Sequence, residues 1–192
     1  MGCTRGTAVA VVGERRIEVI RGITRTPAVR LNPMLSSAEV GWQGFLFEQH
    51  SSDTPHVVEF PDHYSTKHLL RLNTGGPSKN DWRIDGRGRR THDEPGGVSI
   101  LPAGTHVSVV DSSRSSCILL EINPTQLQQS SSDDRNVELA AQLTISDRQI
   151  TLLMTAMQAD LEAGSPAGPL YGESLGNALG TYLSKRYGTV AF

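Results

Sequence analysis

Between residues 42 and 122 the chain contains short segments that are rich in β-branched and aromatic residues. Some of these segments are continuously apolar, and in others apolar and polar positions alternate. Short segments of this kind, bounded by turn residues, are typical of β-strands. The predicted strands are 42–49, 56–60, 67–72, 81–84, 97–101, 106–110 and 117–122. The pair Asp85-Gly86 favours a tight hairpin after the fourth strand, because both residue types tolerate positive φ. This spacing of strands predicts a small barrel or a sandwich.

In the last third of the chain the period of the hydrophobic positions changes from two to about 3.6, which indicates helices. The pattern Ser146-x-x-Gln149 is that of a capping box at a helix start, and Gly164 is placed to end that helix. A second helix is predicted from about residue 170 to residue 186. The short connection 164–169 predicts that these two helices are antiparallel neighbours.

The chain divides by these patterns into three parts. We expect a basic, partly disordered arm at residues 1–35, a β-barrel at residues 36–124, and a linker with a helical segment at residues 125–192. Within the last part, the Ser-rich stretch 126–134 is interpreted as a mobile joint, and a less regular helix is predicted around residues 137–143.

Composition and charge limit the classes of function. A chain of 192 residues with 37% hydrophobic and 20% charged residues fits one globular domain. Its longest apolar runs, 8–12 and 117–120, are far shorter than the roughly 18 residues that span a bilayer, and its two cysteines indicate no disulfide framework. We therefore expect a soluble protein of the reducing cytoplasm that contacts no membrane.

The net charge of −2 gives the whole chain no electrostatic attraction for nucleic acid. Residues 1–30 nevertheless hold six arginines and two glutamates, a charge of +4, which leaves −6 on the remainder. A second basic run, Arg87, Arg89 and Arg90, crosses the predicted hairpin, where it is either a solvent-facing strand or a contact for an anion. Both strong helices use their apolar face for packing, so no element is predicted to enter a DNA groove.

Catalytic motifs are weak. The six histidines include no His-x-His pair, which would project two imidazoles from one face of a strand. His68 and His106 fall in predicted strands, where each is interpreted as a core or pocket residue. The chain has no Gly-x-Ser-x-Gly elbow and no phosphate loop in a strand-to-helix setting. We expect no catalytic residue, no metal ligand and no cofactor.

One motif points to a family. Residues 96–104 fit Gly-x5-Pro-x-Gly, the second box of the cupin barrel. Together with the segments 42–48, 68–72, 82–86, 118–124 and 170–187, in that order, the chain resembles the N-terminal sensor half of AraC-family bacterial transcription regulators. The resemblance covers about residues 36–188, and residues 171–187 are its most specific piece.

The resemblance implies an α+β fold. It consists of a cupin-like β-barrel, a double-stranded β-helix or jelly roll, followed by two or three C-terminal helices of which the last two are antiparallel. It also implies a small-molecule effector in the barrel and a homodimer formed through the helices. The cupin metal pattern expects a histidine where Val107 stands, and His106 falls one place early on the opposite face, so the barrel is expected to hold no metal. In this family two helix-turn-helix units follow the sensor, so DNA contact is expected only through a domain that this chain lacks.

We therefore predict the effector-sensing and dimerising module of an AraC-type regulator, without catalysis, in which the arm is a candidate lid. The predicted ligand-binding residues are Trp42, His68, Trp82 and His106, because aromatic and imidazole groups on strands offer stacking area and hydrogen bonds. The predicted dimer seam comprises the apolar residues of the two helices, part of which is expected to pack inside the chain: Met154, Met157, Leu161, Leu175, Leu179, Tyr182 and Leu183.

Two alternatives stay open at this point. One is a metal-dependent cupin enzyme of the isomerase or dioxygenase type, whose metal would be held by His68 and His106. The other is a dimerisation scaffold that binds no ligand. The residues also leave open which effector is bound, whether it activates or represses, which genes respond, and whether the chain is a truncated regulator or a stand-alone domain.

Overall fold

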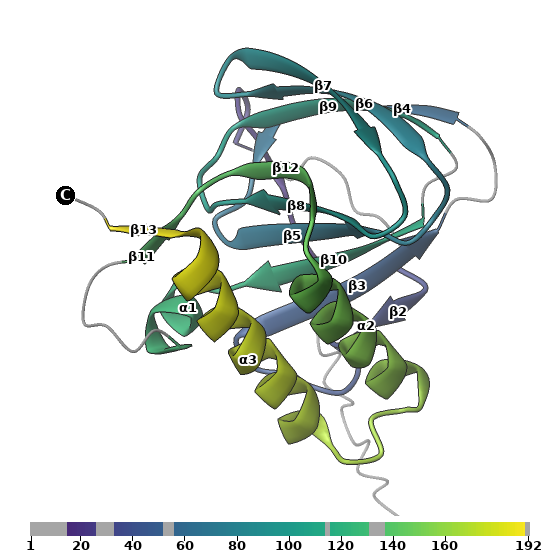
Figure 1. Ribbon diagram of the computed structural model, residues 1–192, viewed down its shortest axis with the longest axis vertical. Helices are drawn as coiled ribbons and strands as arrows, with labels where there is room; N and C mark the ends of the chain where they lie inside the picture. The colour runs from purple at the N-terminus through teal and green to yellow at the C-terminus, as the bar shows by residue number, and fades with distance from the viewer. Residues whose placement is uncertain (1–14, 26–32, 52–55, 114–115, 131–136, 191–192) are drawn as a thin grey trace, which may run out of the picture.

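The structure is a computed structural model that describes residues 15–25, 33–51, 56–113, 116–130 and 137–190. In these residues two antiparallel sheets pack face to face, and three helices cover the outer face of one of them (Figure 1). The five-stranded sheet has the order β1-β4-β9-β6-β7, and the six-stranded sheet has the order β12-β8-β5-β10-β3-β2. A two-stranded ribbon, β11-β13, lies beside the C-terminal helix.

The strands are β1 (Ile20–Arg21), β2 (Leu35–Ser36), β3 (Phe45–Ser51), β4 (His56–Tyr64), β5 (His68–Asn73), β6 (Ser78–Ile84), β7 (Arg87–Asp93), β8 (Gly97–Leu101), β9 (Val107–Ser113), β10 (Ser116–Ile122), β11 (Val137–Leu139), β12 (Gln142–Ser146) and β13 (Gly188–Val190). The helices are α1 (Pro124–Ser130), α2 (Arg148–Glu162) and α3 (Pro169–Tyr187). Each of the seven predicted strands corresponds to an observed one, as do both strong helices, which run antiparallel (Figure 1). The α+β class is confirmed.

The hairpin β6–β7 forms where the sequence predicts it. Asp85 and Gly86 both have positive φ, 45° and 80°, which is the backbone of a tight turn that matches the twist of the strands. The hairpin register pairs Ile84 with Arg87 and Trp82 with Arg89.

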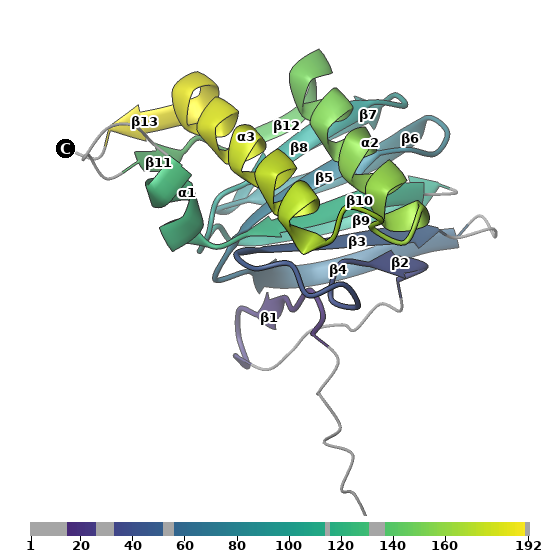
Figure 2. The ribbon, with the colours of Figure 1, turned by 90° about the horizontal axis from the view of Figure 1, so that it is seen from below.

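The six-stranded sheet has two chemically different faces, because successive residues of a strand point to opposite sides. The helices lie over one side of this sheet (Figure 2), and the apolar residues on that side form one cluster with them. Its barrel-interior side faces the five-stranded sheet and mixes apolar side chains with buried charges. The strand residues of the helix-facing cluster are Phe45, Phe47, Leu70, Leu72, Val98, Ile100, Ile118, Leu120 and Ile122.

Helix α3 lies close to this sheet because two glycines remove side chains from its contact face. A Cβ atom at Gly172 would overlap the indole of Trp42, and one at Gly176 would come 2.8 Å from the ring of Phe45. The two glycines are four residues apart and therefore lie on one face of the helix. Both aromatic rings are almost fully buried as a result.

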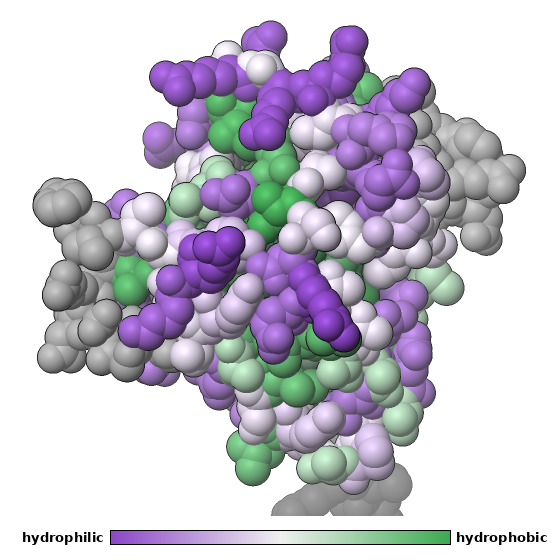
Figure 3. Space-filling model, in the orientation of Figure 1, coloured by the Kyte–Doolittle hydropathy of each residue, from purple (hydrophilic) through white to green (hydrophobic). Residues whose placement is uncertain are grey.

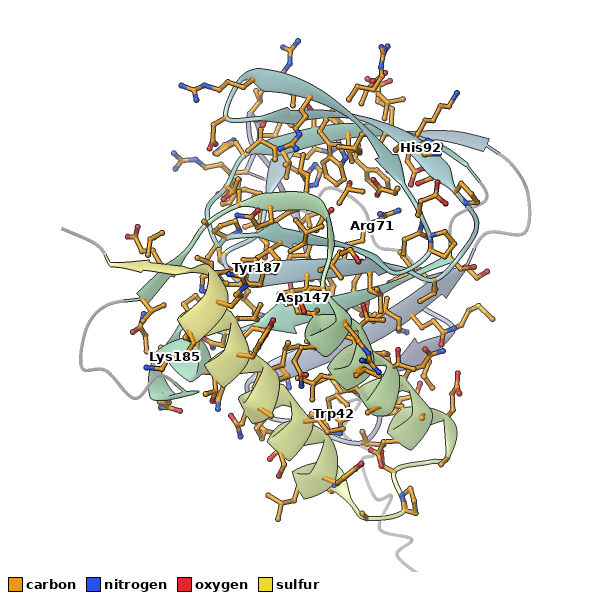
Figure 4. All side chains as sticks on the ribbon, in the orientation of Figure 1. Trp42, Arg71, His92, Asp147, Lys185 and Tyr187 are labelled. Carbon is orange, nitrogen blue, oxygen red and sulfur yellow. The ribbon has the colours of Figure 1, made fainter. Side chains whose placement is uncertain are left out.

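Helix α2 begins differently from the prediction. Its N-cap is Asp147 and not Ser146: the Asp147 carboxylate accepts hydrogen bonds from the backbone N–H groups of Gln149 at 2.9 Å and Ile150 at 3.1 Å. The second carboxylate oxygen accepts hydrogen bonds from the hydroxyl groups of Tyr182 at 2.9 Å and Tyr187 at 2.6 Å. Asp147 thereby joins the start of α2 to the end of α3, and Figure 4 shows Tyr187 directed towards it.

The segment after the barrel contains the main corrections. The helix predicted around residues 137–143 is wrong, because this region forms β11 and β12. Its apolar residues fall in two pairs spaced by two, Val137 with Leu139 and Leu143 with Ile145, which is the period of a strand. A register shift in β12 then places Leu143 in the interior cluster and Ile145 against the helix-facing cluster.

The predicted boundaries also shift. Strand β12 pairs with β8, so the six-stranded sheet extends beyond the predicted limit at residue 124. The predicted mobile joint at 126–134 is helical as far as Ser130, and residues 131–136 lie outside the described residues. Within the predicted arm, β1 pairs with β4, and residues 1–14 and 26–32 are outside the described residues. Among the described helices, none combines the length and apolarity needed to cross a bilayer.

Candidate functional site

The space between the sheets holds a buried ion network centred on Arg71 of β5. Its guanidinium group donates to Asp93 of β7 at 2.9 Å and to Asp111 of β9 at 3.4 Å. Asp93 also accepts hydrogen bonds from the hydroxyl groups of Thr91 and Thr144. The side chains of Arg71 and Asp93 are 12% and 1% exposed, so these charges are compensated by one another and not by bulk water. Arg71 thus ties one sheet to the other, and Figure 4 shows it between them.

A second polar group lies on the interior side of β3. Glu48 contacts His50 through Oε2 at 3.0 Å and accepts a hydrogen bond from the backbone N–H of Ile17 at 3.0 Å. Ile17 belongs to the arm, and its side chain packs with the interior apolar cluster: Leu46, Leu69, Trp82, Leu101, Val107 and Leu143. Arg15 donates to the backbone carbonyl oxygen of Trp42 at 2.8 Å. The described part of the arm is therefore docked against the barrel, with Ile17 inside it.

Glu121 of β10 is the third buried charge. Burial raises its pKa, while the hydrogen bond from the Lys67 ammonium group at 2.7 Å acts in the opposite direction, and the Glu48 carboxylate adds to the increase. A carboxyl group with a raised pKa is less readily ionised, so Glu121 depends on Lys67 to carry its charge inside the barrel.

Asn80 of β6 has an unsatisfied acceptor in the same interior. Its side-chain nitrogen donates to Ser78 Oγ at 3.2 Å, but its Oδ1 atom has no hydrogen-bond partner among the described residues. Asn80 is 1% exposed and pairs with Asp111 and Thr91 across the sheet, next to the Arg71 network. A buried amide oxygen without a donor is costly, so the site suits a bound water or a ligand hydroxyl or N–H group.

Among the surface depressions formed by the described residues, two lie beside the barrel. A shallow groove of about 640 Å³ lies over β4, β9, β6 and β7 and includes the ion pair between Arg90 and Asp81, whose atoms are 2.6 Å apart. A cleft of about 590 Å³ lies where the β6–β7 hairpin approaches β12. Its lining residues are Ile84, Asp85, Arg87, Gly88, Arg89, Ala141 and Leu143. We call this second depression the hairpin cleft.

The structure separates the four predicted ligand-binding residues. Trp42 is fully buried under α3, where it packs edge-on against Phe47, and its indole N–H has no partner among the described residues (Figure 4). His68 lies on the helix-facing side of β5, where its Nδ1 atom accepts a hydrogen bond from the backbone N–H of Ala103 at 3.1 Å. Burial lowers the pKa of His68 to about 4, so the imidazole is neutral at pH 7. These two side chains belong to the protein core and not to the barrel interior.

The other two lie on the barrel side. Trp82 packs in the interior cluster, and its Nε1–H donates to Thr91 Oγ1 at 3.1 Å. His106 lies at the rim before β9, half exposed, stacked on Tyr64 with ring centres 5.0 Å apart and with Nδ1 3.2 Å from the Asp62 carboxylate. Of the four, Trp82 alone lines the interior.

The predicted dimer seam is largely used within the chain. Five of its residues, Met154, Met157, Leu161, Leu179 and Leu183, are at most 5% exposed, and all belong to the helix-facing cluster. Leu175 and Tyr182 are partly buried against the same cluster. Side chains without accessible surface cannot contact a partner, so a second copy that associates with this conformation cannot use these five residues.

Apart from Trp82, the sequence analysis missed the residues whose side chains lie in the interior. Arg71 is a charged residue among the three leucines of β5, which is the pattern of an inward-facing polar group. Its partners Asp93 and Asp111 come from separate strands of the other sheet, and no spacing in the sequence links them to Arg71.

Comparison with known proteins identifies the fold. No protein-family model matches the chain, and no curated protein matches it. Among solved structures, apo ToxT from Vibrio cholerae is similar with a TM-score of 0.58 at 11% identity, over 74% of this chain and 55% of that chain. A cupin superfamily protein from Desulfitobacterium hafniense DCB-2 is 12% identical over 42% of this chain and 69% of that chain, with a TM-score of 0.35. A cupin-2 domain containing protein from Shewanella frigidimarina is 13% identical over 48% and 80%, with a TM-score of 0.36.

The fold is a cupin-like β-barrel followed by C-terminal helices, as predicted. In the described residues, no group of three or more His, Cys, Asp or Glu side chains is arranged to hold a metal ion.

Proposed function

We propose that this chain is the effector-sensing and dimerising module of an AraC-type bacterial transcription regulator and has no catalytic activity of its own. In this proposal the barrel binds a small molecule, a second copy associates through the outer faces of α2 and α3, and DNA is contacted by a helix-turn-helix region distinct from the described helices. The module acts in the cytoplasm, where such regulators meet DNA.

The observation that carries the proposal is the extent of the similarity to ToxT, a regulator of the AraC family. Strands β2 to β10 span residues 35–122, less than half of the chain, whereas the similarity to ToxT covers 74% of it. The similarity therefore extends beyond these strands and includes part of the segment after the barrel. The combination of a barrel with this helical segment distinguishes such a module from a cupin barrel alone.

The barrel interior supports the sensing part. It contains compensated charges, an amide oxygen without a donor, and the arm residue Ile17 in the same apolar cluster as Trp82. A ligand that binds differently to the docked and undocked arm would shift the balance between them, which is the physical requirement for a sensor.

The dimerising part rests on the outer faces of the helices. Leu152 of α2 is 53% exposed, and Leu170 and Tyr171 at the start of α3 are 72% and 47% exposed. Figure 3 shows hydrophobic surface at the end of the molecule where α2 connects to α3. These side chains remain available to a second copy, unlike the buried residues of the predicted seam.

A substitution tests this surface. The double variant Leu170→Glu, Tyr171→Glu places charges in the proposed interface, and we expect sedimentation velocity to show a monomer where the parent chain is a dimer. Circular dichroism should be unchanged, because both side chains are exposed. The matched control, Arg83→Glu on the five-stranded sheet, should remain dimeric. A monomeric parent chain, or a variant that stays dimeric, contradicts the proposed surface.

A reporter assay tests the function. The chain is fused to a DNA-binding domain that represses only as a dimer, and cells are screened with sugars and aromatic acids. We expect repression that depends on the fused chain and changes with at least one compound, and the purified chain should melt at a higher temperature with that compound. Stoichiometric tightly bound iron, manganese or zinc in the purified protein would instead favour a cupin enzyme.

A further inference from the structure

The hairpin cleft has walls from both sheets. Strand β7 is the last strand of the five-stranded sheet and β12 is the last strand of the six-stranded sheet, and the two edges approach one another (Figure 1). The cleft of about 590 Å³ between them falls in the size range of small-molecule sites.

Two arginines of β7 belong to this cleft. Arg87 pairs with Ile84 and Arg89 pairs with Trp82, so the pleat directs both side chains to the interior side of the sheet, with Ile84 and Trp82. Being two residues apart on one strand, they stand roughly 7 Å apart along it, close enough for both guanidinium groups to reach one anion.

These two arginines differ from their neighbour Arg90. Arg90 points to the opposite face and is paired with Asp81 at 2.6 Å. Among the described residues, no carboxylate forms an ion pair with Arg87 or Arg89. The one carboxylate that lines the cleft, Asp85, accepts a hydrogen bond from the backbone N–H of His106 at 3.3 Å. The cleft therefore holds an excess of positive charge in a chain whose net charge is −2.

The floor of the cleft is apolar. Leu143 is buried in the interior cluster, and Ile84 packs against that cluster. Figure 3 shows hydrophobic surface in this region, next to the hydrophilic side chains of the hairpin. Charge at one wall and apolar surface at the floor are complementary to a molecule with an anionic group and an apolar body.

We propose that the hairpin cleft binds an organic carboxylate, with its carboxylate group between Arg87 and Arg89 and its apolar body on Ile84 and Leu143. This inference rests on the proposed sensing function and names the class of its effector. Because the floor is continuous with the cluster that contains Ile17, an occupant of the cleft reaches the core on which the arm is docked.

The test uses isothermal titration calorimetry with the full chain and a series of aryl carboxylates: benzoate, 3-phenylpropionate and 4-phenylbutyrate. We expect affinity to rise along the series by up to about fourfold for each methylene that is buried on the floor. The alcohol 4-phenylbutanol, which has the same apolar body without the charge, should bind at least tenfold more weakly than 4-phenylbutyrate.

The variants locate the site. Arg87→Gln and Arg89→Gln together should weaken 4-phenylbutyrate binding at least tenfold, whereas Arg83→Gln, on the opposite face of the hairpin, should leave it within about twofold. All three positions are exposed, so circular dichroism and the melting temperature should match those of the parent chain. Undetectable binding of all three acids, or equal binding by the double variant, overturns the assignment of the cleft.

The two proposals fail in different ways. Suppose that the fusion protein represses as a dimer and responds to another compound, while the cleft variants bind 4-phenylbutyrate as the parent chain does. The assignment of the cleft is then wrong, and the proposed regulatory function is retained. If the acids bind through Arg87 and Arg89 but neither dimerisation nor a reporter response is found, the cleft stands and the regulatory function is wrong.

Discussion

The two faces of the six-stranded sheet are built from alternate residues of the same strands, yet they differ in chemistry. The buried residues of the helix-facing side are apolar apart from His68, and they pack closely enough that α3 needs glycine at two contacts. The barrel-interior side buries Glu48, Arg71 and Glu121 among apolar residues. The first face supplies burial of apolar area, which is non-directional and stabilising. The second holds polar groups that are stable only when each has a partner, and such groups can also recognise a ligand.

Removing the central charge of the interior should have the largest effect. Arg71→Ala leaves Asp93 and Asp111 in the barrel without their counter-charge, and we expect a loss of about 3–5 kcal/mol in the free energy of unfolding. Urea denaturation monitored by circular dichroism measures this loss of stability. Arg71→Lys, which keeps the charge, should lose clearly less, and an alanine variant as stable as the lysine variant would show that the ion network does not hold the sheets together.

A change on the helix-facing side should have an intermediate effect. Gly172→Ala brings a methyl group into the buried Trp42 indole, and we expect a loss of about 2 kcal/mol, because overpacking outweighs the gain in helix propensity. The exposed position Ser174 is the control, since Ser174→Ala in the same helix should be neutral or slightly stabilising. Thermal unfolding of both variants compares them, and a stabilised Gly172→Ala protein would mean that α3 does not sit on Trp42 as described.

The junction between α2 and α3, on the helix-facing side, should respond least. Asp147→Ala removes the N-cap of α2 and the acceptor for Tyr182 and Tyr187, with an expected loss of about 1–2 kcal/mol by urea denaturation at pH 7. Ser146→Ala, at the position that the capping-box pattern favours, should change stability by less than about 0.5 kcal/mol. If Ser146→Ala loses more stability than Asp147→Ala, the N-cap of α2 is Ser146 and not Asp147.

The same residue predicts a dependence on pH. Burial alone would raise the pKa of Asp147, but the hydrogen bonds from Tyr187, Tyr182 and two backbone N–H groups lower it below the usual 3.8. A carboxyl group whose pKa is lower in the folded state than in the unfolded state stabilises the fold at pH values above its unfolded-state pKa. This stabilisation is lost as the pH falls through the folded-state pKa. Below about pH 4 the difference in stability between the parent chain and Asp147→Ala should therefore shrink, and a difference independent of pH would contradict the role of the charge.

Much of the fold was predictable because its signals are local. Strand and helix periods, the Asp85-Gly86 turn and the stop at Gly164 each depend on a few neighbouring residues, and the structure confirms them. The region 137–143 was misassigned because it is short, and a few apolar residues fit either period until pairing with β8 and β13 selects the strand.

The candidate site was less predictable. Trp42 and His68 are residue types that occur in ligand pockets, but their side of the sheet depends on strand register and on where α3 packs. The apolar helix positions correctly marked a packing surface without saying whether it meets the same chain or a second copy. The sequence leaves the run Arg87, Arg89 and Arg90 as either a solvent-facing strand or an anion contact, and the approach of β12 decides that Arg87 and Arg89 line a cleft while Arg90 pairs with Asp81.

The order of residues by itself determined the seven strands between residues 42 and 122, the two long helices, the tight hairpin, and the resemblance to a regulator's sensor half. The tertiary structure decided which charges meet inside the barrel, which apolar side chains are already buried within one chain, and which arginines of the hairpin line a cleft. The reason is the range of the forces involved. Backbone preferences act between neighbours in sequence, whereas Arg71 and Asp93, 22 residues apart, become partners only when two sheets close on one another.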